Sequence, residues 1–137
     1  MKKILLILTL GLFTGLALQA QDDEHDKIRD KMREFIQRRL NLTRNEAERF
    51  TPVFVRYFKE WRQTLRENKG DNLVRIQRIA ELRIRYRTEF RDIVGEQRSN
   101  DVYKQQDIFV REVTKMREEQ IKRRDDRPNK RFRALVQ

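Results

Sequence analysis

Apolar residues recur along most of the chain at steps of three and four. The pattern is strongest between Leu40 and Leu65. Such spacing places the apolar side chains on one face of an α-helix and leaves the intervening charged residues on the other. No stretch shows the alternation or hairpin turns that are typical of strands. We therefore predict an all-α protein whose central helix carries Phe50, Phe54, Tyr57, Phe58, Trp61 and Leu65 on one face.

Three further segments share this periodicity. A helix is expected from Lys27 to Leu40, another follows the break at Asn68-Lys69-Gly70, and a last one follows Gly95. We expect Gly70 to adopt a left-handed C-cap conformation. The third helix would be capped by Asp71 or Asn72, and the last by Ser99 or Asn100. Together these elements predict a long antiparallel helical hairpin with short flanking helices.

The central helix has a clear start signal. Thr43 followed by Glu46 fits a capping box, in which each residue's side chain accepts a hydrogen bond from the other's backbone amide. Pro52 is the anomaly, because an internal proline removes one hydrogen bond at a cost of about 3 kcal/mol. Either the helix is kinked there, or Thr51 caps a fresh start with Pro52 in the first turn.

The first twenty residues have the pattern of a signal peptide. Lys2 and Lys3 precede an apolar run from Ile4 to Leu18, and Ala20 is the expected cleavage site. The alternative is an uncleaved membrane anchor, but the run is shorter than the roughly 20 apolar residues that a spanning helix needs. The absence of cysteine excludes a lipid-attached cysteine and any disulfide framework. We expect a signal peptide at 1–20, a flexible acidic leader at 21–26, a helical domain at 27–122 and a basic disordered tail at 123–137.

Composition narrows the class of protein. Charged residues make up 40% of the chain and hydrophobic residues 37%, which predicts a thin core and favours dimerisation. The net charge of +11 makes nucleic acid a candidate partner. However, the basic residues form no helix-turn-helix, RNA-binding or zinc-finger pattern, and a signal peptide would export the chain. We therefore do not expect nucleic acid to be the partner.

Catalysis and metal binding are not expected. The chain has one histidine, no cysteine and no glycine-rich phosphate loop, so it lacks the partners for nucleophilic catalysis. Most carboxylates lie beside Arg or Lys and are interpreted as surface ion pairs. His25 with its acidic neighbours could form a loose metal site, but transition-metal sites usually draw on several His or Cys ligands. We predict no enzyme activity, no cofactor and no metal.

The start of the central helix resembles a known motif. Leu42-Thr43-Arg44-Asn45-Glu46-Ala47, followed by Phe50, Pro52 and Tyr57, resembles the LTxxQ motif of small periplasmic Spy/CpxP-like proteins. The resemblance is closest to Bacteroidetes-type variants, some of them labelled sensors of extracytoplasmic-function sigma factors. Glu46 replaces the motif's Gln, and Ile93-Val94-Gly95-Glu96-Gln97 is similar to a degraded second copy. The resemblance implies a helical-hairpin protomer, a curved antiparallel homodimer, a periplasmic location, and either holding unfolded proteins or reporting envelope stress.

These inferences lead to a binding hypothesis. The aromatic stripe is either a surface for client proteins or the core and dimer interface, and the Arg-rich faces are either a cationic binding surface or a solvated exterior. We expect an ATP-independent chaperone or sensor of the envelope. The alternatives are a dedicated regulatory partner of a membrane-bound signalling protein, and a binder of anionic envelope surfaces with peripheral membrane contact through residues 123–137. The predicted contacts are Phe54, Phe58, Trp61, Arg83, Arg87 and Arg91, and the motif and capping residues are Leu42, Thr43, Glu46 and Pro52.

Overall fold

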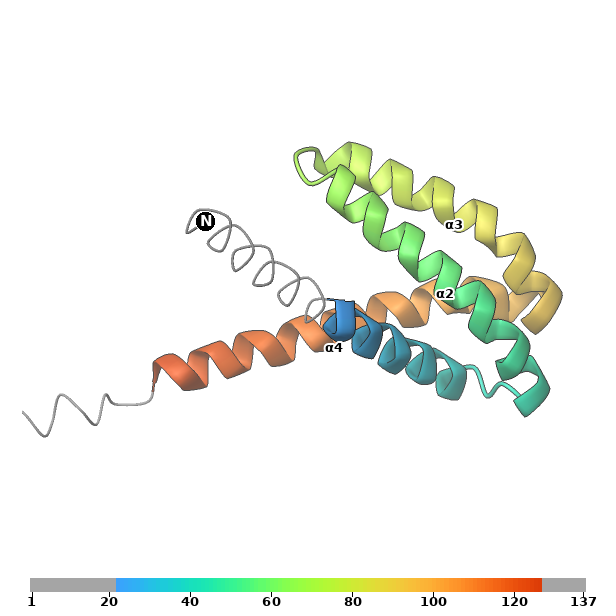
Figure 1. Ribbon diagram of the computed structural model, residues 1–137, viewed down its shortest axis with the longest axis horizontal. Coiled ribbons are helices and arrows are strands. Elements are labelled where there is room, and N and C mark those ends of the chain that lie inside the picture. The colour runs from blue at the N-terminus through green and yellow to red at the C-terminus, as the bar shows by residue number, and fades with distance from the viewer. Residues whose placement is uncertain (1–21, 127–137) are drawn as a thin grey trace, which may run out of the picture.

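A computed structural model describes residues 22–126, and this part of the chain is helical with no strand. The chain is helical over residues 22–39 and continues as α2 (Arg44–Glu67), α3 (Asn72–Val94) and α4 (Glu96–Asp125), as Figure 1 shows. The all-α prediction is confirmed. The predicted signal peptide at 1–20 and residues 127–137 of the predicted tail lie outside the described residues.

The helices form two arms that meet at one end of the molecule. Helices α2 and α3 pair as an antiparallel hairpin, which confirms the predicted hairpin (Figure 1). Helix α4 turns back from the end of α3, and residues 22–39 lie along it in the opposite direction. The Phe35 and Phe109 rings are 5.5 Å apart, and Arg117 lies 4.0 Å from Glu24. The hairpin arm and the α4 arm diverge from this common end.

Helix α4 is longer than a short flanking helix. It has 30 residues, against 24 in α2 and 23 in α3. The sequence contains neither glycine nor proline between Gly95 and Pro128, so nothing stops the helix once it has started. Residues 22–26, predicted as a flexible leader, are helical, and α4 continues through residues 123–125 of the predicted tail.

Local capping chemistry explains where the helices begin. The capping box is present: the Glu46 amide donates to Thr43 Oγ1 at 3.2 Å, and the Thr43 amide donates to Glu46 Oε1 at 3.1 Å. Asp71 caps α3 by accepting from the Val74 amide at 3.1 Å. Helix α2 runs through Pro52 without a fresh start, and the Thr51 hydroxyl instead donates to the Ala47 carbonyl at 2.9 Å.

Two predicted boundaries are wrong. Gly70 is not left-handed, because positive φ among the described residues occurs only at Asn41 and Gly95, and Asn68 forms the C-cap of α2. The last helix is not capped by Ser99 or Asn100. It begins at Glu96 directly after Gly95, whose φ of 89° and ψ of 170° let the chain turn within one residue. Ser99 is instead fully buried inside α4.

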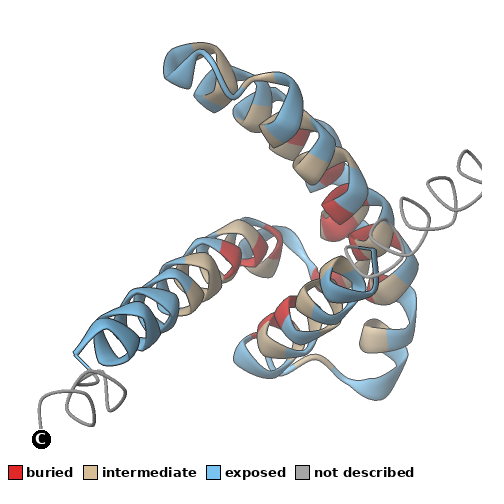
Figure 2. Cartoon of the chain, turned by 60° about the vertical axis from the view of Figure 1, so that its left-hand side comes forward, coloured by how far each residue is buried: buried red, intermediate tan, exposed pale blue. Residues whose placement is uncertain are grey.

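The core occupies the region where the arms meet. Aromatic side chains dominate it, with the Phe50 and Phe90 rings 5.2 Å apart and the Tyr57 and Tyr86 rings 5.4 Å apart. Figure 2 shows buried residues where the helices meet and exposed residues along the outer part of α4 and near the hairpin turn. The buried hydrophobic residues are Met32, Ile36, Leu40, Phe50, Val53, Phe54, Tyr57, Phe58, Leu82, Tyr86, Phe90, Val94 and Val102.

Candidate protein-binding surface

The predicted aromatic contacts divide between the core and the surface. Phe54 is fully buried and Phe58 is only 4% exposed, so both side chains belong to the core. Trp61, one turn further along α2, is half-buried and lies 5.6 Å from the Phe58 ring. Of the three aromatic residues predicted to contact a partner, only Trp61 is therefore more than marginally exposed.

Arg83 joins three helices. From α3 it makes two hydrogen bonds to the Asp107 carboxylate of α4, at 2.6 and 3.2 Å. It also donates to Gln106 Oε1 at 3.0 Å and to the Tyr57 hydroxyl of α2 at 3.3 Å. Its guanidinium lies 5.2 Å from the centre of the Tyr103 ring. We call Arg83, Tyr57, Tyr103, Gln106 and Asp107 the Arg83 network.

The charges in this network are fixed at neutral pH. Burial disfavours the Arg83 cation, but its hydrogen bonds to Asp107 and Tyr57 outweigh that effect and raise the pKa of Arg83. Burial also raises the pKa of Tyr57 and of Tyr103, so both phenols stay protonated. Arg83 thus holds the arms together, and only about a fifth of its side chain is exposed.

The other two predicted arginines follow Arg83 at intervals of four on α3 and differ in their partners. Arg87 is exposed and makes no ion pair with any residue in 22–126. Arg91 pairs with Glu96 at 3.0 Å across the Gly95 joint. The three arginines therefore share a face of α3, but only Arg87 is uncommitted within the described part of the chain.

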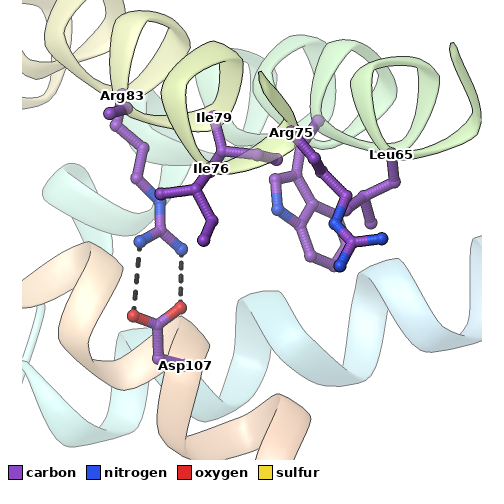
Figure 3. Close-up of a pocket in the computed structure, with 8 residues that line it drawn as sticks. Leu65, Arg75, Ile76, Ile79, Arg83 and Asp107 are labelled. Carbon is purple, nitrogen blue, oxygen red and sulfur yellow. Dashed lines mark hydrogen bonds and ion pairs between the residues drawn. The ribbon is translucent and has the colours of Figure 1, made fainter. Parts of the chain in front are cut away.

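A groove of about 360 Å³ lies beside the Arg83 network (Figure 3). Most of its walls are apolar and come from the outer half of the hairpin. The ion pair between Arg83 and Asp107 bounds it on one side, and Arg75 contributes a second positive charge. Its lining residues are Trp61, Leu65, Arg75, Ile76, Ile79, Ala80, Arg83 and Asp107.

The apolar surface continues beyond the groove along α3. Leu73 is 78% exposed and Ile76 is 57% exposed, although both follow the apolar spacing of α3. Leu73 and Ile76 follow the same three-residue spacing as the buried Leu82, so periodicity alone does not show that they are uncovered.

The motif residues lie near the start of α2, away from the groove. Arg98 of α4 hydrogen-bonds to both carboxylate oxygens of Glu46 and to the Leu40 carbonyl. The hydrogen bond from the Thr43 amide and those from Arg98 lower the pKa of Glu46. Leu42 is half-buried against the core. Leu42, Thr43 and Glu46 therefore fix the joint that precedes α2, and their position gives them no contact with the groove.

Neither a metal centre nor a membrane span is found within residues 22–126. No group of three or more His, Cys, Asp or Glu side chains there could hold a metal ion. His25 lies against Arg62 of α2, with 2.7 Å between its Nε2 atom and the guanidinium. None of the helices described is long and apolar enough to cross a bilayer.

Comparison of the chain with protein-family models, with curated proteins and with solved structures found no match.

Proposed function

We propose that this chain is a periplasmic protein of the envelope-stress response that binds unfolded or partner proteins without ATP. The groove beside Trp61 and its extension over Leu73 and Ile76 support this proposal most directly. Contiguous apolar surface rimmed by charge is typical of sites that bind other proteins. In this chain 40% of the residues are charged, and an exposed apolar surface on such a chain supports the binding of a partner protein.

The chemistry of the groove suggests what it would bind. An apolar segment of an unfolded protein would pack on Trp61 and Ile76, while acidic residues beside it would be attracted to Arg75 and to the surrounding positive charge. Apolar contacts over a small area and screened charges give reversible binding. The proposed contacts therefore move from Phe54 and Phe58 to Leu73 and Ile76, with Trp61 retained.

Suppression of aggregation tests the proposal. Residues 21–137 would be added to a reduced, unfolding model protein at low and high salt. We expect protection at equimolar amounts that weakens with salt. The double variant Leu73→Gln/Ile76→Gln should protect several-fold less well. The matched control is Met116→Gln/Ile121→Gln, which removes two side chains of α4 that are 55% and 60% exposed and lie outside the groove.

The two variants distinguish specific binding at the groove from nonspecific hydrophobic binding elsewhere on the protein. An unchanged control together with a weakened groove variant would support the groove as the binding surface. Equal loss in both variants would refute it, and no protection by the unmodified chain at several-fold excess would count against chaperone activity.

The ion pair that bounds the groove favours a second candidate function. Because Arg83 and Asp107 give the groove a fixed border, it could select one segment of a dedicated partner, such as the periplasmic part of a membrane-bound signalling protein. One tight partner in envelope extracts, lost in Leu73→Gln/Ile76→Gln, would favour the regulator. Weak binding to many unfolded proteins would favour the chaperone.

A further inference from the structure

A second hollow lies on another face of α2, between that helix and residues 22–39. Its volume is about 430 Å³. Helix α2 contributes Lys59, Arg62 and Arg66, whose spacing of three and four residues places them on one helical face. Residues 22–39 contribute His25 and Arg29. We call this site the basic hollow.

The basic hollow carries an excess of positive charge over the two carboxylates, Asp22 and Asp26, that also line it. Lys59, Arg62 and Arg66 form no ion pair within residues 22–126. Arg29, in contrast, is held by Asp26 at 3.0 Å and by Asp30 at 3.2 Å. Like charges three and four residues apart on a helix repel one another. An arrangement of this kind is relieved by binding an anion.

His25 adds an unused hydrogen-bond donor. Arg62 has only donors, so the 2.7 Å contact makes His25 Nε2 the acceptor and places the proton of the neutral ring on Nδ1. Nδ1 is buried and has no hydrogen-bond partner in the described part of the chain. A buried donor without an acceptor is unfavourable and is usually satisfied by a ligand or water.

The environment of Arg62 also favours the binding of an anion. Burial and the neighbouring charge of Arg66 lower the pKa of Arg62, and Asp22 only partly offsets this. The guanidinium is thus held in a partly desolvated position beside another cation. A bound anion would stabilise it by direct hydrogen bonds.

We propose that the basic hollow binds a phosphate group, with Arg62 and Arg66 as its main ligands and Lys59 as a supporting charge. A guanidinium binds phosphate oxygens through paired hydrogen bonds, and a dianion matches the excess of positive charge. Asp22 and Asp26 also line the hollow, but Asp26 is already paired with Arg29. Val55 and Phe58 offer apolar contact for the organic part of a phosphate monoester.

The test uses the single histidine of the chain as a local reporter. Purified protein would be titrated at constant ionic strength with inorganic phosphate and, separately, with a soluble short-chain phosphatidic acid. Binding would be followed by calorimetry and by the NMR signals of the His25 ring. The site variant is Arg62→Gln/Arg66→Gln. The control is Lys104→Gln/Lys115→Gln, which removes the same charge from exposed positions of α4.

We expect both probes to shift the His25 signals in the unmodified protein and in the control. The site variant should bind at least tenfold more weakly and show no shift. Tighter binding of the phosphatidic acid would identify a lipid phosphate as the source, and similar binding of both would identify a free phosphate. Absence of saturable binding at millimolar concentration, or equal weakening in the control, would overturn the proposal.

Discussion

At the scale of single residues, Arg83 is among the most extensively hydrogen-bonded side chains of the described structure. Its ion pair with Asp107 and its hydrogen bonds to Gln106 and Tyr57 link three helices within a few ångströms. The sequence placed Arg83 on a charged helical face, and no local pattern indicates its partner 24 positions away. Arg83, which was predicted to contact client proteins, therefore has a structural role in connecting the helices.

Replacement of Arg83 tests this role. Arg83→Met should destabilise the protein by about 1–3 kcal/mol, because Gln106 and Tyr57 lose a charged partner while remaining buried. Arg83→Lys should recover only part of that loss, since Lys lacks the planar fork. Urea denaturation measures both. Arg87→Met is the control and should stay within about 0.5 kcal/mol of the unmodified protein; a comparable loss there would contradict the assignment.

The three tyrosines of the chain give a pH-dependent signature. Burial and the hydrogen bond to Glu60 raise the pKa of Tyr86 to about 12, and burial raises the pKa of Tyr57 and Tyr103 as well. Each phenol donates a hydrogen bond, which requires the proton. A raised pKa in the folded state means that this stabilisation is complete below pH 10 and is lost as the pH rises through the folded values.

Absorbance near 295 nm measures this ionisation. We expect little phenolate in the folded protein at pH 10.5, against a majority of phenolate in urea, where the pKa values return to about 10. The folded protein should also become less stable in urea as the pH is raised above 10. Ionisation of all three tyrosines at pH 10 with no loss of structure would contradict the packing described.

At the scale of elements, the two loop glycines differ in what they do. Gly95 joins α3 to α4 with a φ of 89°, whereas Gly70 has no positive φ. A Cβ atom would meet nothing within 4 Å at either position. Any difference between alanine substitutions therefore reports backbone conformation and not crowding.

Gly95→Ala should destabilise the protein by about 1–3 kcal/mol, because an L-residue is strained in that backbone region. Gly70→Ala should be neutral or stabilising by up to about 1 kcal/mol, since it only reduces the freedom of the unfolded chain. Thermal and urea unfolding of both variants provides the comparison. Equal effects would mean that the joint between α3 and α4 tolerates other conformations.

Element type was predictable, whereas element partners were not. The three-and-four spacing of Phe50, Phe54 and Tyr57 identified the buried face of α2, and Thr43 with Glu46 identified its start. These signals are local. The groove depends on which part of α3 fails to find cover, and the basic hollow depends on His25 meeting Arg62, 37 residues away. Sequence periodicity contains no information on such pairings.

At the scale of the whole molecule, stability is expected to be uneven. The buried residues of the hairpin fall at 50–58 of α2 and 82–94 of α3, on the side away from the turn. Residues near the turn pack few apolar side chains and include the exposed Leu73 and Ile76. Regions with little burial open locally at a small fraction of the global free energy.

Hydrogen exchange should measure this difference in local stability along the hairpin. Helical amides of residues 62–67 and 75–80 are expected to exchange by local opening, at least tenfold faster than those of residues 53–58 and 84–90. An equally fast outer half of α4 would agree with its exposure. Uniform protection along the hairpin would show that the outer half is covered in solution, as it would be in the expected homodimer.

Any rotation at the Gly95 joint would be amplified along α4. Helix α4 has 30 residues and is about 45 Å long, so a rotation of about 10° at this joint would move its far end by roughly 8 Å. Asp107 lies only about 17 Å along the same lever and would move by about 3 Å, enough to break its ion pair with Arg83. The Arg83 network would then set the angle between the hairpin and α4. A ligand in the groove that displaced Asp107 would shift the far end of α4.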